Sequence, residues 1–113
     1  MDQTLEVSEI GADSDPSKIV RFKGPLLISN LFTFQATVRN SRTAKLILDM
    51  TEVPYIDSAA VGVLVGAYVS REKDGRQLLL VGVNPRVRAV LQVTQVERFF
   101  QFADKVPESA AGA

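Results

Sequence analysis

The sequence predicts an α/β domain, a small mixed β-sheet with helices packed on it in the order β-β-α-β-α-β-α. Three observations support this fold class. Two early segments have the mixed polar and apolar character of half-buried strands, two later segments are continuously apolar, and helical patterns lie between and after them. Continuous apolar strands are typical of a sheet covered on both faces, as parallel sheets are.

The N-terminal half supplies two strands and one helix. Residues 5–10 alternate apolar and polar side chains, and residues 18–23 form a second strand after a turn cluster of Gly, Asp, Ser and Pro, which predicts an antiparallel pair. A helix is then expected from a cap at Ser29 or Asn30 to about Asn40. Its predicted core face consists of Leu31, Phe34 and Val38.

The central segments form a predicted strand–helix–strand unit. A buried strand over 45–50 is followed by a loop over 51–56, a helix over 58–74 and a second buried strand over 78–83. Gly75, just past the last helical residue, is a typical helix terminator. These three segments are expected to form a βαβ unit, with two parallel strands in one sheet and a right-handed crossover.

The C-terminal part supplies a last helix and a short strand. Asn84 is the expected cap of that helix, and Pro85 suits its first turn. A final short strand is expected over 99–102. The apolar face of the helix is predicted to consist of Val87, Val90, Leu91 and Thr94.

Length and composition indicate one globular domain. The chain has 113 residues, of which 46% are hydrophobic and 23% are charged. We expect a single domain over residues 1–113, with an ordered core over 5–102 and a flexible tail over 107–113. The start of the chain is polar and acidic, and the longest apolar run is too short to span a bilayer. These features predict a cytoplasmic protein with no membrane insertion.

Charge balance and missing residue types exclude several function classes. Thirteen Lys and Arg residues balance thirteen Asp and Glu residues, so nucleic-acid binding has no electrostatic driving force. The chain contains no His and no Cys, which excludes His-dependent catalysis, His-ligated zinc and thiolate chemistry. Asp49 and Asp57 could form a carboxylate pair, but no base accompanies them. We therefore expect no enzyme, no metal and no cofactor.

The most informative motif is the pair Asp57 and Ser58 at the start of the helix over 58–74. The first backbone N–H groups of a helix lack partners within the helix, and the helix dipole favours negative charge there. Either residue can therefore cap the helix, and Ser58 is also a candidate phosphate acceptor. Thr51, in the preceding loop, is a second but less favoured phosphate acceptor.

The helix over 58–74 is apolar on almost every side. One stripe, the expected core face, consists of Val61, Leu64, Val65 and Tyr68. A second set falls largely outside that stripe and consists of Val63, Gly66, Ala67 and Val69. This second face is either buried against a neighbouring helix or exposed for a partner, and the sequence favours neither alternative. The candidate partner-binding residues are Asp57, Ser58, Ala59, Val63, Gly66 and Val69.

Residues 49–62, which read DMTEVPYIDSAAVG, resemble the signature loop of STAS domains, which occur in sulfate transporters and anti-sigma-factor antagonists. The family pattern is a strand ending in Asp, a short loop, and Asp-Ser-Ser-Gly-Leu-Gly opening a helix. Here Ala59 and Ala60 replace the usual Ser-Gly. Residues 82–85 and the helix after them match the next family element, and the resemblance covers about residues 5–102.

The resemblance implies a binding module rather than an enzyme. The regulatory serine of the freestanding bacterial antagonists falls on Ser58, so the expected partner is an anti-sigma factor that is also a serine kinase. Phosphorylation would release that partner, a phosphatase would restore binding, and the outcome would be transcription regulation.

Two other functions remain open. Residues 24–30 depart from the Gly-acidic-apolar-Asp pattern of antagonists and look more like the transporter branch. The alternative is therefore a regulatory STAS domain, or a soluble STAS subunit, of an anion transporter or other membrane transport assembly without a phosphorylation switch. A third possibility is a nucleotide-binding or hydrolytic domain with weak nucleotide binding at the Ser58 loop.

Overall fold

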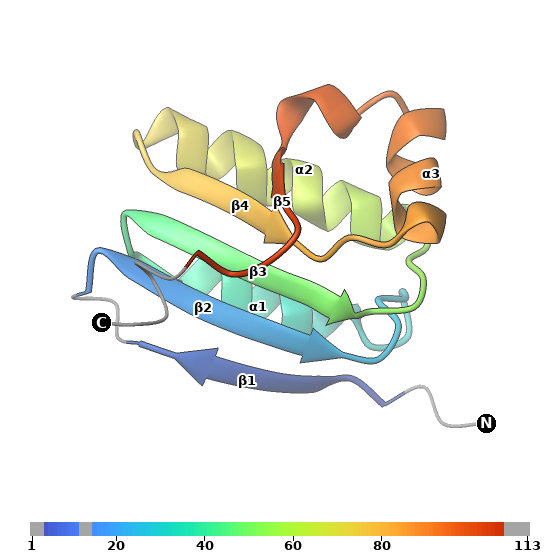
Figure 1. Ribbon diagram of the computed structural model, residues 1–113, viewed down its shortest axis with the longest axis horizontal. Helices are drawn as coiled ribbons and strands as arrows, with labels where there is room; N and C mark the ends of the chain where they lie inside the picture. The colour runs from blue at the N-terminus through green and yellow to red at the C-terminus, as the bar shows by residue number, and fades with distance from the viewer. Residues whose placement is uncertain (1–3, 12–14, 108–113) are drawn as a thin grey trace.

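The computed structural model describes residues 4–11 and 15–107 as five strands and three helices around one mixed sheet (Figure 1). The sheet order follows the chain order from β1 to β5. The first two strands pair antiparallel, and every later neighbour pairs parallel, so the predicted mixed sheet is confirmed. The strands are β1 (Glu6–Ile10), β2 (Ser17–Lys23), β3 (Lys45–Glu52), β4 (Gln77–Val81) and β5 (Gln101–Ala103).

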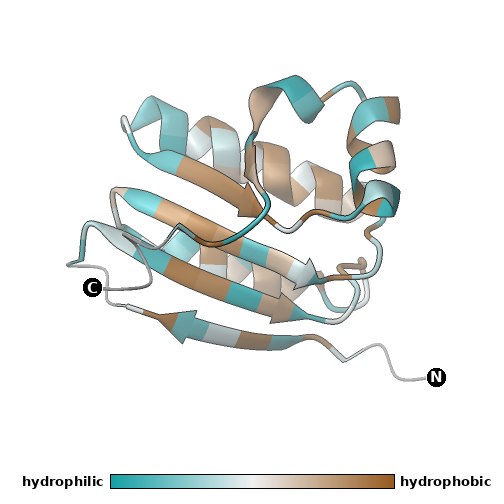
Figure 2. Cartoon of the chain, viewed as in Figure 1, coloured by the Kyte–Doolittle hydropathy of each residue, from teal (hydrophilic) through white to brown (hydrophobic). Residues whose placement is uncertain are grey.

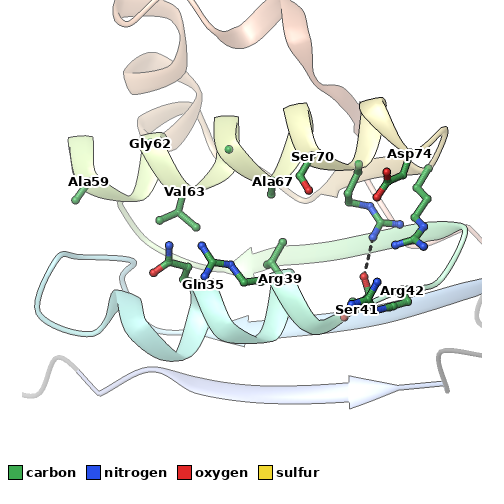
Figure 3. Close-up of a pocket in the computed structure, with 14 residues that line it drawn as sticks. Gln35, Arg39, Ser41, Arg42, Ala59, Gly62, Val63, Ala67, Ser70 and Asp74 are labelled. Atoms are coloured by element: carbon green, nitrogen blue, oxygen red, sulfur yellow. Dashed lines mark hydrogen bonds between the residues drawn. The ribbon is translucent and has the colours of Figure 1, made fainter.

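Two long helices lie side by side on one face of this sheet, behind the strands in Figure 1. They are α1 (Leu31–Asn40) and α2 (Ser58–Lys73), and their N-termini point to the same end of the molecule (Figure 3). The shorter α3 (Pro85–Val93) contacts α2, and a 3-10 turn, η1 (Glu97–Phe99), precedes β5. The predicted order of helices and strands is confirmed.

The main core lies between the sheet and the helices. Phe34 of α1 packs edge-on against Phe22 of β2, with ring centroids 4.9 Å apart. Figure 2 shows the apolar bands on the central strands. Leu64 and Leu91 complete the core from α2 and α3, and both are fully buried. Burial of these side chains supplies the main driving force for the fold.

The second face of the sheet is also covered, as the continuous apolar strands predict. A smaller buried cluster there consists of Ile19, Ile47, Leu79 and Val81. Its cover is not a helix: Ala103 and Val106, at the end of β5 and just after it, pack against the cluster. In Figure 1 this segment crosses the front of the sheet.

Several predicted boundaries are wrong by a few residues. β4 ends at Val81 instead of residue 83, because Gly82 turns the chain with φ +69° and its N–H donates to the carbonyl of Ala103. β3 continues two residues further, to Glu52. Thr94, placed on the apolar face of the last helix, is an exposed residue at its C-cap. The predicted tail over 107–113 lies outside the described residues except for Pro107.

The last predicted strand also needs correction. Phe99 lies in the 3-10 turn η1 rather than in a strand, and β5 begins at Gln101. The ring of Phe99 stacks on the ring of Tyr68 in α2, with centroids 5.6 Å apart. This aromatic contact stabilises the packing of the 3-10 turn against α2 before the chain joins the sheet.

Candidate partner-binding surface

Asp57 organises the loop from which α2 begins. One carboxylate oxygen accepts from the N–H of Ala60 at 3.0 Å, so Asp57 is the N-cap of α2. The other oxygen accepts from the N–H of Ile28 at 2.8 Å, and the N–H of Asp57 donates to the carbonyl of Leu26. A single side chain therefore joins the loop before α1 to the start of α2.

Ser58 is the first helical residue and is exposed. Because Asp57 caps the helix, the alternative that Ser58 is the cap is wrong. Within the described part of the chain, no hydrogen bond of the Ser58 hydroxyl is present. The hydroxyl is therefore available to solvent, next to a carboxylate and at the positive end of the α2 dipole.

The other predicted cap is also corrected. Asn30 occupies the N-cap position of α1, but its side chain makes no capping hydrogen bond. Its amide instead accepts from the N–H of Leu27 and donates to the carbonyl of Pro25. Asn30 thus fixes the turn that presents Ile28.

Two exposed apolar side chains stand at this end of the molecule and were not predicted from the sequence. Ile28 is 76% exposed in the loop that Asp57 anchors, and Phe32 is 82% exposed in the first turn of α1. A helical wheel of α1 identifies Phe32, because it lies off the core face that contains Phe34 and Val38. No local pattern identifies Ile28, whose position depends on the long-range contact with Asp57. Both side chains leave apolar area in contact with water at this end of the molecule.

Thr51, the less favoured phosphate acceptor, has a structural partner. Its hydroxyl donates to Asp49 at 2.6 Å, and its N–H donates to the same carboxylate oxygen at 3.1 Å. Arg21 pairs with the other oxygen at 3.0 Å. Burial alone would raise the pKa of Asp49, but these bonds together outweigh it and hold the pKa below its ordinary value. Asp49 thus joins β3 to β2, whereas Asp57 organises the start of α2, so the two carboxylates do not form a pair.

The second face of α2 divides into two parts. Ala59, Val63 and Gly66 line a groove between α1 and α2, whereas Val69 is 56% exposed and lies outside it. On the helix, Val69 falls on the same outward stripe as Ser58. Val63 and Ala67 are half-buried and pack partly on the core, so this face is partly buried and partly exposed.

The expected core stripe of α2 is confirmed at Val61 and Leu64, which are buried. Val65 and Tyr68 are only half-buried, and Ala60 and Arg71 complete the buried face instead. Arg71 was not predicted because its guanidinium is held by backbone carbonyls of distant segments, which a helical wheel does not reveal.

In residues 4–11 and 15–107 no group of three or more acidic, His or Cys residues is placed to hold a metal ion. Over the same residues, no helix combines the length and the apolar character needed to cross a membrane.

The fold and this surface define a small α/β domain with an exposed serine at a helix start and apolar side chains nearby. The family model for the STAS domain matches residues 7–109. The chain therefore belongs to the STAS domain family, as the resemblance of residues 49–62 implies.

Curated relatives and a solved structure agree with this assignment. An anti-sigma-B factor antagonist of Listeria monocytogenes is 39% identical over 47 residues, which are 42% of this chain and 41% of that protein. A proposed anti-sigma factor antagonist of Thermotoga neapolitana is 34% identical over 65 residues, 58% of each chain. The chain thus matches less than two thirds of the length of either relative. An anti-sigma factor antagonist from Mycobacterium paratuberculosis shares the fold, with TM-score 0.80, 14% identity, and coverage of 99% of this chain and 95% of that one.

Proposed function

We propose that this chain is an anti-sigma factor antagonist that binds its partner while Ser58 is unphosphorylated and releases it when Ser58 carries a phosphate. The observation that carries the proposal is the exposed Ser58 hydroxyl at the first position of α2, beside the loop that presents Ile28. The names of the Listeria and Thermotoga relatives support the same function.

The contact with the partner is largely apolar in this proposal. Ile28 and Phe32 contribute from the α1 side, and Ser58 and Val69 contribute from the outward stripe of α2. Ala59, Val63 and Gly66 form the adjoining wall of the groove. A partner that covers these side chains removes apolar area from water, which favours binding.

A phosphate on Ser58 would disrupt that contact by electrostatics. It carries about −1.5 to −2 charges at pH 7. The start of α2 offsets part of this charge within the domain, so the fold should survive modification. The partner would have to desolvate the rest, next to the carboxylate of Asp57, against apolar side chains. The complex should therefore dissociate.

The partner is an anti-sigma factor that is also a serine kinase, and a phosphatase restores the unmodified form. The chain itself then acts in the cytoplasm as a binding protein, without catalysis, nucleic acid or cofactor. Thr51 is not the modified residue in this proposal, because its hydroxyl is engaged with Asp49.

The test compares four immobilised proteins: wild type, S58A, S58D and the control S8D. Ser8 is exposed on the edge strand β1, so S8D adds the same charge on the sheet rather than on α2. Wild type, S58A and S8D should capture the same partner, which mass spectrometry identifies, and S58D should capture at least about tenfold less. The purified partner, given ATP, should then phosphorylate wild type and T51A but not S58A.

Equal capture by S58D and wild type would refute the switch. That result, together with no phosphate on Ser58, would instead favour a transport-regulating STAS domain without phosphorylation.

A further inference from the structure

A groove between α1 and α2 has a volume of about 560 Å³ (Figure 3). This volume falls in the range of small-molecule sites. Its α2 wall is built of small residues, and an added Cβ on Gly62 or Gly66 would meet no atom within 4 Å. Val38 and Val63 supply apolar surface from the two helices, so the groove is open and partly apolar.

One end of the groove is strongly basic. Four arginines and a single carboxylate line it. The arginines are Arg39, Arg42, Arg71 and Arg76, and the carboxylate is that of Asp74. In Figure 3, Arg39 extends from α1 into the space below α2, and Arg42 lies opposite Asp74. Within the described ranges, Arg39, Arg42 and Arg76 form no ion pair with a carboxylate. With four arginines and one carboxylate, the groove therefore carries a net positive charge.

The fold itself concentrates this charge. Arg71 is only 5% exposed, and its guanidinium donates to the carbonyls of Ser41, Thr43 and Gln77, which are neutral groups. Gly75, with φ +71°, ends α2 so that the N–H of Arg76 returns to the carbonyl of Arg71 at 2.8 Å. The end of α2 thus brings two arginines together, with Asp74 as the nearby carboxylate.

We propose that this groove binds a small organic anion, with its carboxylate or phosphate held by Arg39, Arg42 and Arg76 and an alkyl body lying along Val38 and Val63. Guanidinium groups suit both head groups because they donate parallel hydrogen bonds to paired oxygens. No aromatic side chain lines the groove, so a nucleotide base would have no ring to stack on. An alkyl body fits the lining better.

The test follows amide chemical shifts by NMR during titration with two probes, octanoate and octyl phosphate. Octyl glucoside is the neutral control, inorganic phosphate is the head-group control, and ADP tests a nucleotide. We expect saturable shifts in α1 and α2 for at least one anionic probe, and the tighter one identifies the head group. Added salt should weaken its binding.

Variants then test the assigned residues. The double variant R39Q/R42Q should weaken binding about tenfold or more, whereas R98Q, an exposed arginine in η1, should not change it. G66L should fill the groove and abolish binding while the protein stays folded, because Gly66 lines the groove and a Cβ added there meets no atom within 4 Å. S58D should bind the probe as wild type does, which separates this proposal from the switch at Ser58.

Four results would overturn the proposal. These are the absence of saturable binding by either anionic probe, equal binding of octyl glucoside, unchanged affinity in R39Q/R42Q, and tighter binding of ADP than of both alkyl anions.

Discussion

Asp57 and Ser58 are neighbours in the sequence but have different physical roles. The sequence left the helix cap open between them, because both residue types cap helices well. The structure assigns the cap to Asp57, whose carboxylate also holds the N–H of Ile28. That second bond joins residues 29 positions apart, so no local pattern could have indicated it.

Replacement of these two residues should therefore separate stability from switching. We expect D57A to lower the free energy of unfolding by about 1–2 kcal/mol, because it removes the cap and one long-range hydrogen bond. S58A should change the free energy of unfolding by less than about 0.5 kcal/mol, because its hydroxyl makes no hydrogen bond in the described structure. Urea denaturation measures both. A loss of about 1 kcal/mol in S58A alone would contradict the assignment of the cap.

Asp49 should make the fold sensitive to acid. Its folded-state pKa lies below the ordinary value of 3.8, because hydrogen bonds from Thr51 and Arg21 outweigh the opposing effect of burial. The ionised carboxylate therefore contributes stability above about pH 4, and this contribution is lost as the pH falls through the folded-state pKa. The stability difference between wild type and D49N should be largest at neutral pH and shrink below about pH 4. Thermal melts between pH 7 and 2.5 check this, and a constant difference would contradict it.

At the scale of elements, the sequence predicted the type and order of the helices and strands because their apolar periodicity is strong. The errors in the predicted boundaries lie at the ends of strands, where tertiary contacts determine the last residue. β4 stops at Gly82, where a side chain would clash with the hydroxyl of Thr51, and η1 replaces part of a strand where Phe99 stacks on Tyr68. The groove was also not predicted, since its basic end combines α1, α2 and the residues just after each helix.

One glycine within α2 and one just after it offer a test of this description. Gly66 has helical backbone and open space at its Cβ position, whereas Gly75 has φ +71°. G66A should raise the free energy of unfolding by about 0.5–1 kcal/mol, because alanine favours the helix. G75A should lower it by about 1 kcal/mol, because a side chain disfavours the left-handed conformation. The melting temperature measured by calorimetry should therefore rise in G66A and fall in G75A. A lower melting temperature in G66A than in wild type would mean that the groove beside Gly66 is filled.

At the scale of the whole molecule, helices cover one face of the sheet and the segment after β5 covers the other. Exposed apolar side chains lie at the end of the molecule where α1 and α2 begin. The sequence predicted both-face coverage from the continuous strands but not the segment after β5 that supplies the second cover. It also placed the partner surface on α2 alone. The proposed surface also includes α1 and its preceding loop, because the carboxylate of Asp57 ties that loop to the start of α2.

Two phenylalanines of α1 test whether this enlarged surface meets a partner. Phe32 is 82% exposed and Phe34 is fully buried, although they are two residues apart. F32A should therefore keep the free energy of unfolding within about 0.5 kcal/mol of wild type, and F34A should lower it by about 3–5 kcal/mol. Against the partner captured by wild type, F32A should bind at least about tenfold more weakly, because an exposed aromatic side chain at an interface often contributes strongly. Calorimetric titration measures the affinity. Unchanged affinity in F32A would confine the partner contact to α2, where the sequence alone had placed it.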